Sequence, residues 1–185
     1  MNLLEQFRYV HTFIFDVDGV LTDSSLLILE SGKLLRRMNT RDGFAMKQAL
    51  RAGLRISIIT GGNSAGVIDR LRALGIRDIY AGVEDKVEAY EELLHTYDLH
   101  ESGICYMGDD LPDYEVMQRV GVPACPADAA PEIKAISSYI SPWRGGEGCV
   151  RDVIEKVLKL RGQWVPHLIP PYLPQPPADK KEEGE

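Results

Sequence analysis

Long apolar runs at the amino-terminus, an excess of basic charge and paired cysteines are all missing from this sequence of 185 residues. The amino-terminal segment has no basic leader followed by a sustained apolar run, and its apolar stretch at residues 12–15 ends in an acid. Signal peptides and membrane spans need such runs. We therefore expect neither of them here, and no membrane partner.

Basic residues are outnumbered, since 21 lysines and arginines stand against 28 acids and give a formal net charge of -7. Polyanion-binding surfaces need a positive field, so the balance argues against nucleic acid as a partner. An acidic chain can still bind a small phosphorylated molecule, because a bound divalent cation reverses the sign of the local field.

Cysteine is scarce, with three residues and no CxxC pair: Cys105, Cys125 and Cys149. An odd count without metal-ligand spacing suits a compartment in which thiols stay reduced. We expect a cytoplasmic protein whose cysteines are small buried apolar residues.

Apolar runs rich in β-branched residues alternate with amphipathic segments along the chain. The predicted strands are residues 11–15, 55–60, 79–81, 104–107, 122–125 and 139–140. The predicted helices are residues 43–52, 64–74, 86–97, 111–120 and 149–160. This order predicts an α/β fold with a doubly wound, Rossmann-like parallel sheet.

One segment breaks the alternation, since residues 24–38 contain two strand-like halves around a Glu-Ser-Gly-Lys sequence that favours a tight turn. We predict a β-hairpin there, placed over the end of the sheet where open α/β folds bind ligands. Apolar residues on both faces of its first strand predict that it projects and packs against other copies of the chain.

The chain is long enough for one core, so we expect a single domain over residues 1–164 with no large cap domain. Residues 165–185 are rich in proline and then charged, with nothing to bury. We expect a flexible tail there.

The strongest chemical signal is the sequence DVDG, in which Asp16 and Asp18 directly follow the first predicted strand. Once the chain turns at Gly19, both carboxylates can reach one cavity. Such a concentration of negative charge is tolerable where a hard cation binds carboxylate and backbone oxygens.

A second acidic group follows another predicted strand, in the sequence GDDLPD, and contains Asp109, Asp110 and Asp113. The ends of two parallel strands can converge, so Asp109 could join Asp16 and the backbone carbonyl of Asp18 around one magnesium ion. Asp110 and Asp113 can equally serve as first-turn acids that complement a helix dipole.

Between these groups, Thr60 and Gly61 end a strand and begin a turn whose N–H groups and hydroxyl suit phosphate oxygens. The turn lacks P-loop spacing, which argues against a nucleoside-triphosphate site. Lys86 stands at a predicted helix start, where a cation is disfavoured unless an anion lies before it.

In this order the residues resemble the four motifs of the haloacid dehalogenase superfamily of phosphatases, over roughly residues 11–160. The resemblance implies that Asp16 is the nucleophile and Asp18 the general acid and base. It also implies phosphate binding by Thr60, Gly61 and Lys86. Asp109 would complete a Mg²⁺ site with Asp16 and Asp18, supported by Asp110 and Asp113.

Within the superfamily the chain resembles the small cap-less phosphatases of sugar-acid phosphates that serve lipopolysaccharide synthesis. It shares the hairpin and the sequences FDVDGVLTD, NTRDG, MGDDLPDYEVM and GGEGCVRD. This implies a homotetramer in which neighbouring subunits help close the sites. Arg41 and Arg151 are our candidates for the substrate carboxylate. Many members have Arg after Thr-Gly, where this chain has Gly62.

Two alternatives stay open at this point. The substrate could be a nine-carbon keto-deoxy sugar acid 9-phosphate in place of an eight-carbon one. The chain could also be a catalytically silent assembly module, although a silent copy has no need of four intact motif residues.

Overall fold

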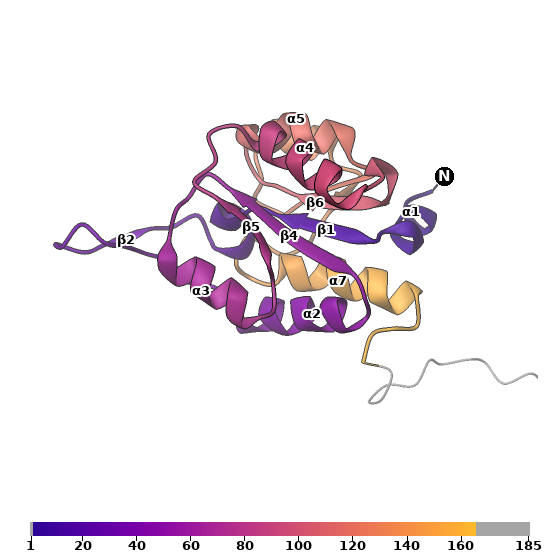
Figure 1. Ribbon diagram of the computed structural model, residues 1–185, viewed down its shortest axis with the longest axis horizontal. Coiled ribbons are helices and arrows are strands. Elements are labelled where there is room, and N and C mark those ends of the chain that lie inside the picture. The colour runs from indigo at the N-terminus through magenta and orange to yellow at the C-terminus, as the bar shows by residue number, and fades with distance from the viewer. Residues whose placement is uncertain (1, 166–185) are drawn as a thin grey trace, which may run out of the picture.

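Six parallel strands form one sheet in the computed structural model of the protein, which describes residues 2–165. The order across the sheet is β5-β4-β1-β6-β7-β8, and every neighbouring pair is parallel. Helices cover both faces (Figure 1). The predicted doubly wound α/β fold is confirmed. The predicted tail lies outside the described residues, except for Val165.

The strands match the apolar runs of the sequence closely. Their bounds are β1 Thr12–Phe15, β4 Arg55–Thr60, β5 Asp78–Ala81, β6 Ile104–Met107, β7 Val122–Cys125 and β8 Tyr139–Ile140. Strands β1 and β6 lie at the centre and are buried along their whole length. A central parallel strand is covered on both faces, which is why its sequence is a continuous apolar run.

Helices form one layer on each face of the sheet. One layer contains α4 (Lys86–Tyr97), α5 (Tyr114–Arg119) and α6 (Pro131–Ile136). The other contains α2 (Thr40–Arg51), α3 (Ala65–Ala73) and α7 (Cys149–Leu160), with α1 (Leu3–Tyr9) beside α7 (Figure 1). No helix among residues 2–165 has both the length and the apolar character of a membrane span.

The structure corrects two of the predicted helices and adds two more. Helix α2 begins at Thr40, before the predicted residue 43, because the side chain of Asn39 accepts a hydrogen bond from the N–H of Arg41 and caps the helix there. The predicted helix over residues 111–120 is a tight turn at residues 111–113 followed by α5. Helices α1 and α6 were not predicted.

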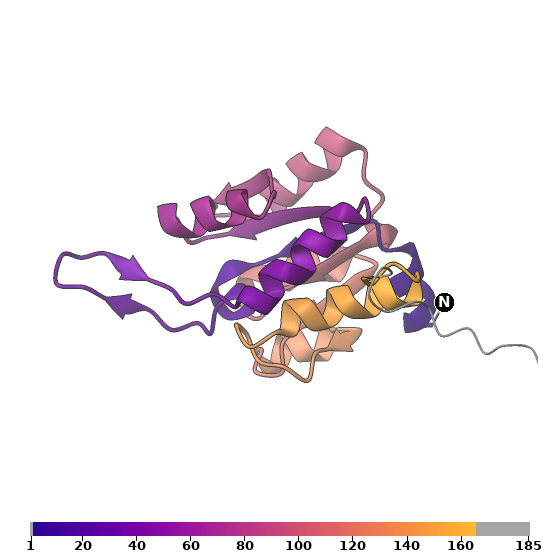
Figure 2. The ribbon, with the colours of Figure 1, turned by 90° about the horizontal axis from the view of Figure 1, so that it is seen from below.

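The hairpin is present where the sequence predicts it. Strands β2 (Leu27–Ile28) and β3 (Leu34–Leu35) pair antiparallel and project from the sheet (Figures 1 and 2). Its apolar side chains are exposed, with 70% of Ile28 and 63% of Leu27 accessible. No large cap covers the described part of the chain.

A buried carboxylate joins α2 to α7. Asp42 on α2 is almost fully buried, and its Oδ1 accepts a 2.7 Å hydrogen bond from the N–H of Arg151 at the start of α7. Its Oδ2 has no hydrogen-bond partner among the residues described. Burial raises the pKa of Asp42 from 3.8 to about 6, against the opposing effect of that hydrogen bond and of the Arg151 charge.

Replacing Asp42 with asparagine tests this buried charge. The folded protein binds the Asp42 proton more tightly than the unfolded chain does, so ionised Asp42 destabilises the fold above about pH 6 and this cost declines as the pH falls. Asparagine keeps the acceptor without the charge. We compare the free energy of unfolding of Asp42→Asn with that of the wild type at two pH values. We expect the variant minus wild-type difference to be roughly 1 kcal/mol more favourable to the variant at about pH 7.5 than at about pH 5.

Urea unfolding at the two pH values measures this difference, and other titrating groups cancel because both proteins share them. An equal difference between variant and wild type at both pH values would show that Asp42 is not held as a costly buried charge.

Candidate active site

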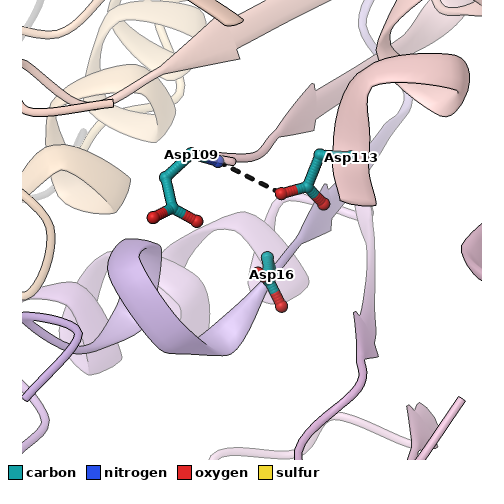
Figure 3. Close-up of side chains that lie close together, drawn as sticks. All are labelled: Asp16, Asp109 and Asp113. Carbon is teal, nitrogen blue, oxygen red and sulfur yellow. Dashed lines mark hydrogen bonds between the residues drawn. The ribbon is translucent and has the colours of Figure 1, made fainter. Parts of the chain in front are cut away.

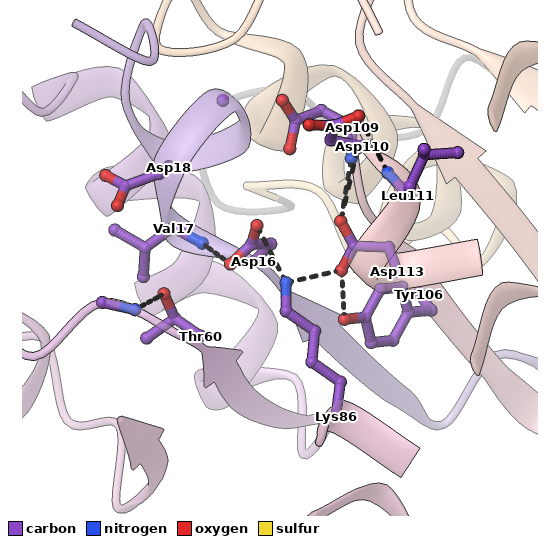
Figure 4. A network of polar contacts seen from close by, with 12 residues as sticks. Asp16, Val17, Asp18, Thr60, Lys86, Tyr106, Asp109, Asp110, Leu111 and Asp113 are labelled. Carbon is purple, nitrogen blue, oxygen red and sulfur yellow. Dashed lines mark hydrogen bonds and ion pairs between the residues drawn. The ribbon is translucent and has the colours of Figure 1, made fainter. Parts of the chain in front are cut away.

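The predicted site residues converge at the carboxyl end of the sheet. A cavity of about 440 Å³ lies between the loops that follow β1, β4, β5 and β6. Eight of the ten residues singled out in the sequence line it: Asp16, Asp18, Thr60, Gly61, Lys86, Asp109, Asp110 and Asp113. Figure 4 shows most of them from close by. Parallel strands place their carboxyl ends together, so motifs far apart in the sequence meet here.

Asp16 is held rigidly at the end of β1. Its N–H donates to the carbonyl of Met107 on β6, and its Oδ1 accepts a 2.6 Å hydrogen bond from the N–H of Val17. The chain then turns at Gly19, which has φ +87°. A Cβ at Gly19 would overlap the carboxylate of Asp109, so glycine is required for Asp109 to approach this turn.

Lys86 supplies positive charge at the centre of the acidic residues. Its side chain is only 6% exposed, and its Nζ lies 3.0 Å from Asp16 Oδ2 and 2.7 Å from Asp113 Oδ1. Burial alone would lower the pKa of Lys86, but the charges of Asp113 and Asp16 outweigh it and raise the pKa. The side chain therefore stays a cation aimed at Asp16.

Asp113 organises the site more than its predicted supporting role suggests. Its Oδ1 accepts hydrogen bonds from Lys86 and, at 2.6 Å, from the Tyr106 hydroxyl. Its Oδ2 accepts from the N–H of Asp109 at 3.2 Å (Figures 3 and 4). Both oxygens are thus engaged by protein donors. Asp113 fixes Lys86 on one side and the Asp109 backbone on the other.

The carboxylates form a site whose chemistry fits a hard cation. Asp16, Asp109 and Asp113 each offer an oxygen, and these oxygens lie within 4.8 Å of one another (Figure 3). Burial and the charges of Asp16 and Asp113 raise the pKa of Asp109 to about 7. Burial and Asp113 likewise raise the pKa of Asp16 to about 6.

Asp16 and Asp113 both interact with protein donors, whereas the carboxylate oxygens of Asp109 stay available to an ion. The protein donates no hydrogen bond to the Asp109 carboxylate within residues 2–165. An all-oxygen donor set with unneutralised negative charge is the environment that Mg²⁺ favours. The residues therefore fit the predicted magnesium ion.

Asp18 has a partner that the sequence did not predict. The Arg36 guanidinium donates to both Asp18 oxygens, from Nε at 2.6 Å and from a terminal nitrogen at 2.9 Å. Arg36 directly follows β3, at the base of the hairpin. The sequence offers two adjacent arginines there, and alternation along a strand means that only one can face the site. Arg37 faces solvent and pairs with Asp23.

The structure places Arg41 and Arg151 away from this cavity in the same chain. Both line a separate cavity of about 600 Å³ beside α7. Arg151 pairs with Glu155 at 2.9 Å, and its guanidinium lies over the Trp164 ring. Within one chain, neither arginine lines the cavity that contains Asp16 and Asp109.

Comparison with known proteins agrees with the fold. The model of the haloacid dehalogenase-like hydrolase family matches residues 74–151. The chain is 36% identical over 162 residues to the 3-deoxy-D-manno-octulosonate 8-phosphate phosphatase KdsC of Escherichia coli K12, covering 88% of this chain and 86% of that protein.

Solved structures of similar proteins superpose closely. A putative phosphatase of the same name from Vibrio cholerae has 38% identity and a TM-score of 0.85, covering 87% of this chain and 90% of its own. The Moraxella catarrhalis phosphatase, in complex with magnesium, phosphate and KDO, has 32% identity and a TM-score of 0.82. It matches 85% of this chain and 90% of its own.

Fold, motif order and site together define a haloacid dehalogenase-like hydrolase. Within that class the chain belongs to the family of the 3-deoxy-D-manno-octulosonate 8-phosphate phosphatases.

The raised pKa values predict that magnesium affinity depends on pH. Asp109 holds a proton up to about pH 7 in the metal-free protein, so a cation must displace that proton at lower pH. We expect the affinity for Mg²⁺ to fall roughly tenfold between about pH 8 and pH 6. Calorimetry in buffers of different ionisation enthalpy measures both the affinity and the protons released.

Asp110→Asn is the matched control, because Asp110 lines the same cavity but is exposed. It should keep the pH dependence, whereas Asp109→Asn should lose most of the binding. An affinity that did not change over this pH range would contradict the assignment of Asp109 as a ligand.

Proposed function

We propose that this protein is a Mg²⁺-dependent phosphatase that hydrolyses 3-deoxy-D-manno-octulosonate 8-phosphate to the free sugar acid and inorganic phosphate. The observation that carries the proposal is the convergence of Asp16, Lys86 and Asp109 in one cavity, in the order that the family motifs require. The relatives from Escherichia coli and Moraxella catarrhalis, named for this substrate or bound to its product, support the choice of substrate.

Asp16 is the nucleophile in this mechanism. Above about pH 6 its carboxylate is ionised, and Lys86 lies 3.0 Å from one of its oxygens. A carboxylate oxygen forms a bond to phosphorus while the ester P–O bond to the sugar breaks, leaving an aspartyl-phosphate. Lys86 and the turn at Thr60 and Gly61 neutralise and orient the phosphate oxygens.

Asp18 handles the protons of both half-reactions. It donates a proton to the sugar oxygen as that oxygen leaves, and then takes a proton from the water that attacks the aspartyl-phosphate. The second step releases inorganic phosphate and restores the Asp16 carboxylate. Bound Mg²⁺, held by Asp16, Asp109 and the Asp18 carbonyl, supplies charge neutralisation for the phosphate.

The assembly that we propose is a homotetramer built through the hairpins. Exposed Leu27 and Ile28 on β2 and Leu34 and Leu35 on β3 form the hairpin surface, an apolar surface on a two-stranded ribbon that cannot bury it alone. A neighbour's surface would also limit water access to the cavity. All three cysteines are buried free thiols, which supports a reducing, cytoplasmic location.

Phosphate release from a panel of sugar phosphates tests the proposed activity. We expect 3-deoxy-D-manno-octulosonate 8-phosphate to give the highest kcat/KM, with turnover dependent on Mg²⁺. Asp16→Asn should abolish turnover with little loss of stability, since it removes the nucleophile and relieves carboxylate repulsion. Asn also keeps the acceptor for the Val17 N–H.

A nine-carbon keto-deoxy sugar acid 9-phosphate belongs in the panel, and faster turnover of it would overturn the substrate assignment. Near-normal activity of Asp16→Asn would instead rule out the aspartyl-phosphate. Wild-type protein that releases no phosphate from any member would favour a silent assembly module.

Charged substitutions on the hairpin surface test the assembly. Leu27→Asp with Ile28→Asp should lower the mass in solution from tetramer to smaller species, because unpaired carboxylates cannot be buried between subunits. Leu4→Asp is the control, since Leu4 is similarly exposed, at 59%, but lies on α1. Light scattering after size-exclusion chromatography reads out the mass.

We also expect the hairpin variant to lose activity in proportion to its loss of tetramer. A double variant that stayed tetrameric and fully active would refute both the assembly and the gating role of the hairpin.

A further inference from the structure

The carboxylate of Asp18 is held away from the reacting centre. Both of its oxygens accept hydrogen bonds from Arg36, whose side chain is only 8% exposed. In Figure 4 the Asp18 carboxylate points away from Asp16 and Lys86. A carboxyl group whose two oxygens are both engaged by a guanidinium cannot deliver a proton to the sugar oxygen. Asp18 must therefore leave Arg36 for the reaction to proceed.

The Asp18–Arg36 ion pair lies between two cavities. Asp18 lines the acidic cavity that contains Asp16, Arg36 lines a groove of about 940 Å³ between the hairpin and the start of α3, and Gly62 lines both. A Cβ on Gly62 would lie 3.1 Å from Asp18 and 3.2 Å from the Arg36 guanidinium. The ion pair thus packs directly over Gly62.

The groove differs from the acidic cavity in charge. Lys33, Arg36 and Arg70 line it, and none of its lining residues within the described part of the chain is acidic. Helix α3 begins in the groove with Ser64, whose side chain makes no cap hydrogen bond, and has no acid in its first turn. In a chain of net charge -7, such a surface suits the anionic end of a ligand.

From these positions we propose that the substrate carboxylate replaces Asp18 on Arg36 and so releases Asp18 for proton transfer. This inference rests on the proposed function and names the residue that recognises the acid end of the substrate. With the phosphate on Asp16 and Lys86, the sugar extends over Gly62 into the groove. Its carboxylate then meets Arg36 in the same two-pronged geometry that Asp18 occupies.

The exchange links recognition to chemistry. One carboxylate replaces another on the same guanidinium, so Arg36 is never left buried without a partner. A sugar phosphate that lacks a carboxylate has no group to displace Asp18, so Asp18 stays on Arg36. The substrate carboxylate therefore increases kcat as well as binding, because its interaction is used to free the general acid.

A matched pair of substrates tests this proposal: 3-deoxy-D-manno-octulosonate 8-phosphate and its analogue with a primary amide in place of the carboxylate. We expect the wild type to prefer the acid by roughly 10- to 100-fold in kcat/KM, the range of a charge-assisted hydrogen-bond pair, with part of the difference in kcat. Arg36→Met should lower kcat/KM for the acid by a similar factor.

Turnover of the amide by Arg36→Met should rise, since Asp18 is no longer held away from Asp16. The ratio of kcat/KM for the acid to kcat/KM for the amide then falls toward one. Arg36→Lys should restore part of it, because lysine keeps the charge but not the two-pronged geometry. Arg37→Met is the matched control and should behave as the wild type, because Arg37 is 78% exposed and pairs with Asp23.

The outcomes separate this inference from the proposed function. An equal loss of turnover for acid and amide in Arg36→Met would reduce Arg36 to a residue that merely positions Asp18. A preference that survives in Arg36→Met, or is absent in the wild type, would overturn the exchange while leaving the phosphatase intact. Failure of the wild type to hydrolyse either compound would overturn the proposed function itself.

Discussion

One buried ammonium group makes the arrangement of the site possible. Asp16, Asp109 and Asp113 offer oxygens within 4.8 Å of one another, an arrangement that repulsion and desolvation both oppose. Lys86 lies between Asp16 and Asp113 and offsets part of that cost. A lysine at the first residue of a helix is unfavourable because its charge opposes the helix dipole. Lys86 and the two carboxylates therefore stabilise one another at positions where each charge alone would be unfavourable.

Strand topology explains how much of this site the sequence could predict. Asp16 follows β1, Thr60 ends β4 and Asp109 follows β6, and all three strands are neighbours in one parallel sheet. Apolar runs predicted these strands within a residue or so, and parallel pairing brings their carboxyl ends together. The local sequence was therefore enough to predict both the fold and the convergence of the motifs, because each motif lies at the carboxyl end of a strand.

Features that depend on tertiary contacts were harder to predict. The base of a hairpin can bring either Arg36 or Arg37 to the site, and the sequence does not fix which face is buried when both strands are short. Arg41 and Arg151 belong to sequences shared with the family, yet they line another cavity. Helix α1 did have a local signal, the capping box of Asn2 and Glu5, but its length of seven residues gives little periodicity.

The hairpin connects two properties that look separate in the sequence. The apolar strand residues Leu27 and Ile28 are exposed, whereas Arg36 at the base of the hairpin is buried against Asp18. A two-stranded ribbon is marginally stable in isolation, so the ion pair at the base restricts its position. In the proposed tetramer, packing of the hairpin surface against a neighbour would also restrict where Arg36 lies relative to Asp18. In that proposal, assembly and proton transfer would both depend on residues 24–38, and these residues would provide part of the closure that a larger cap gives.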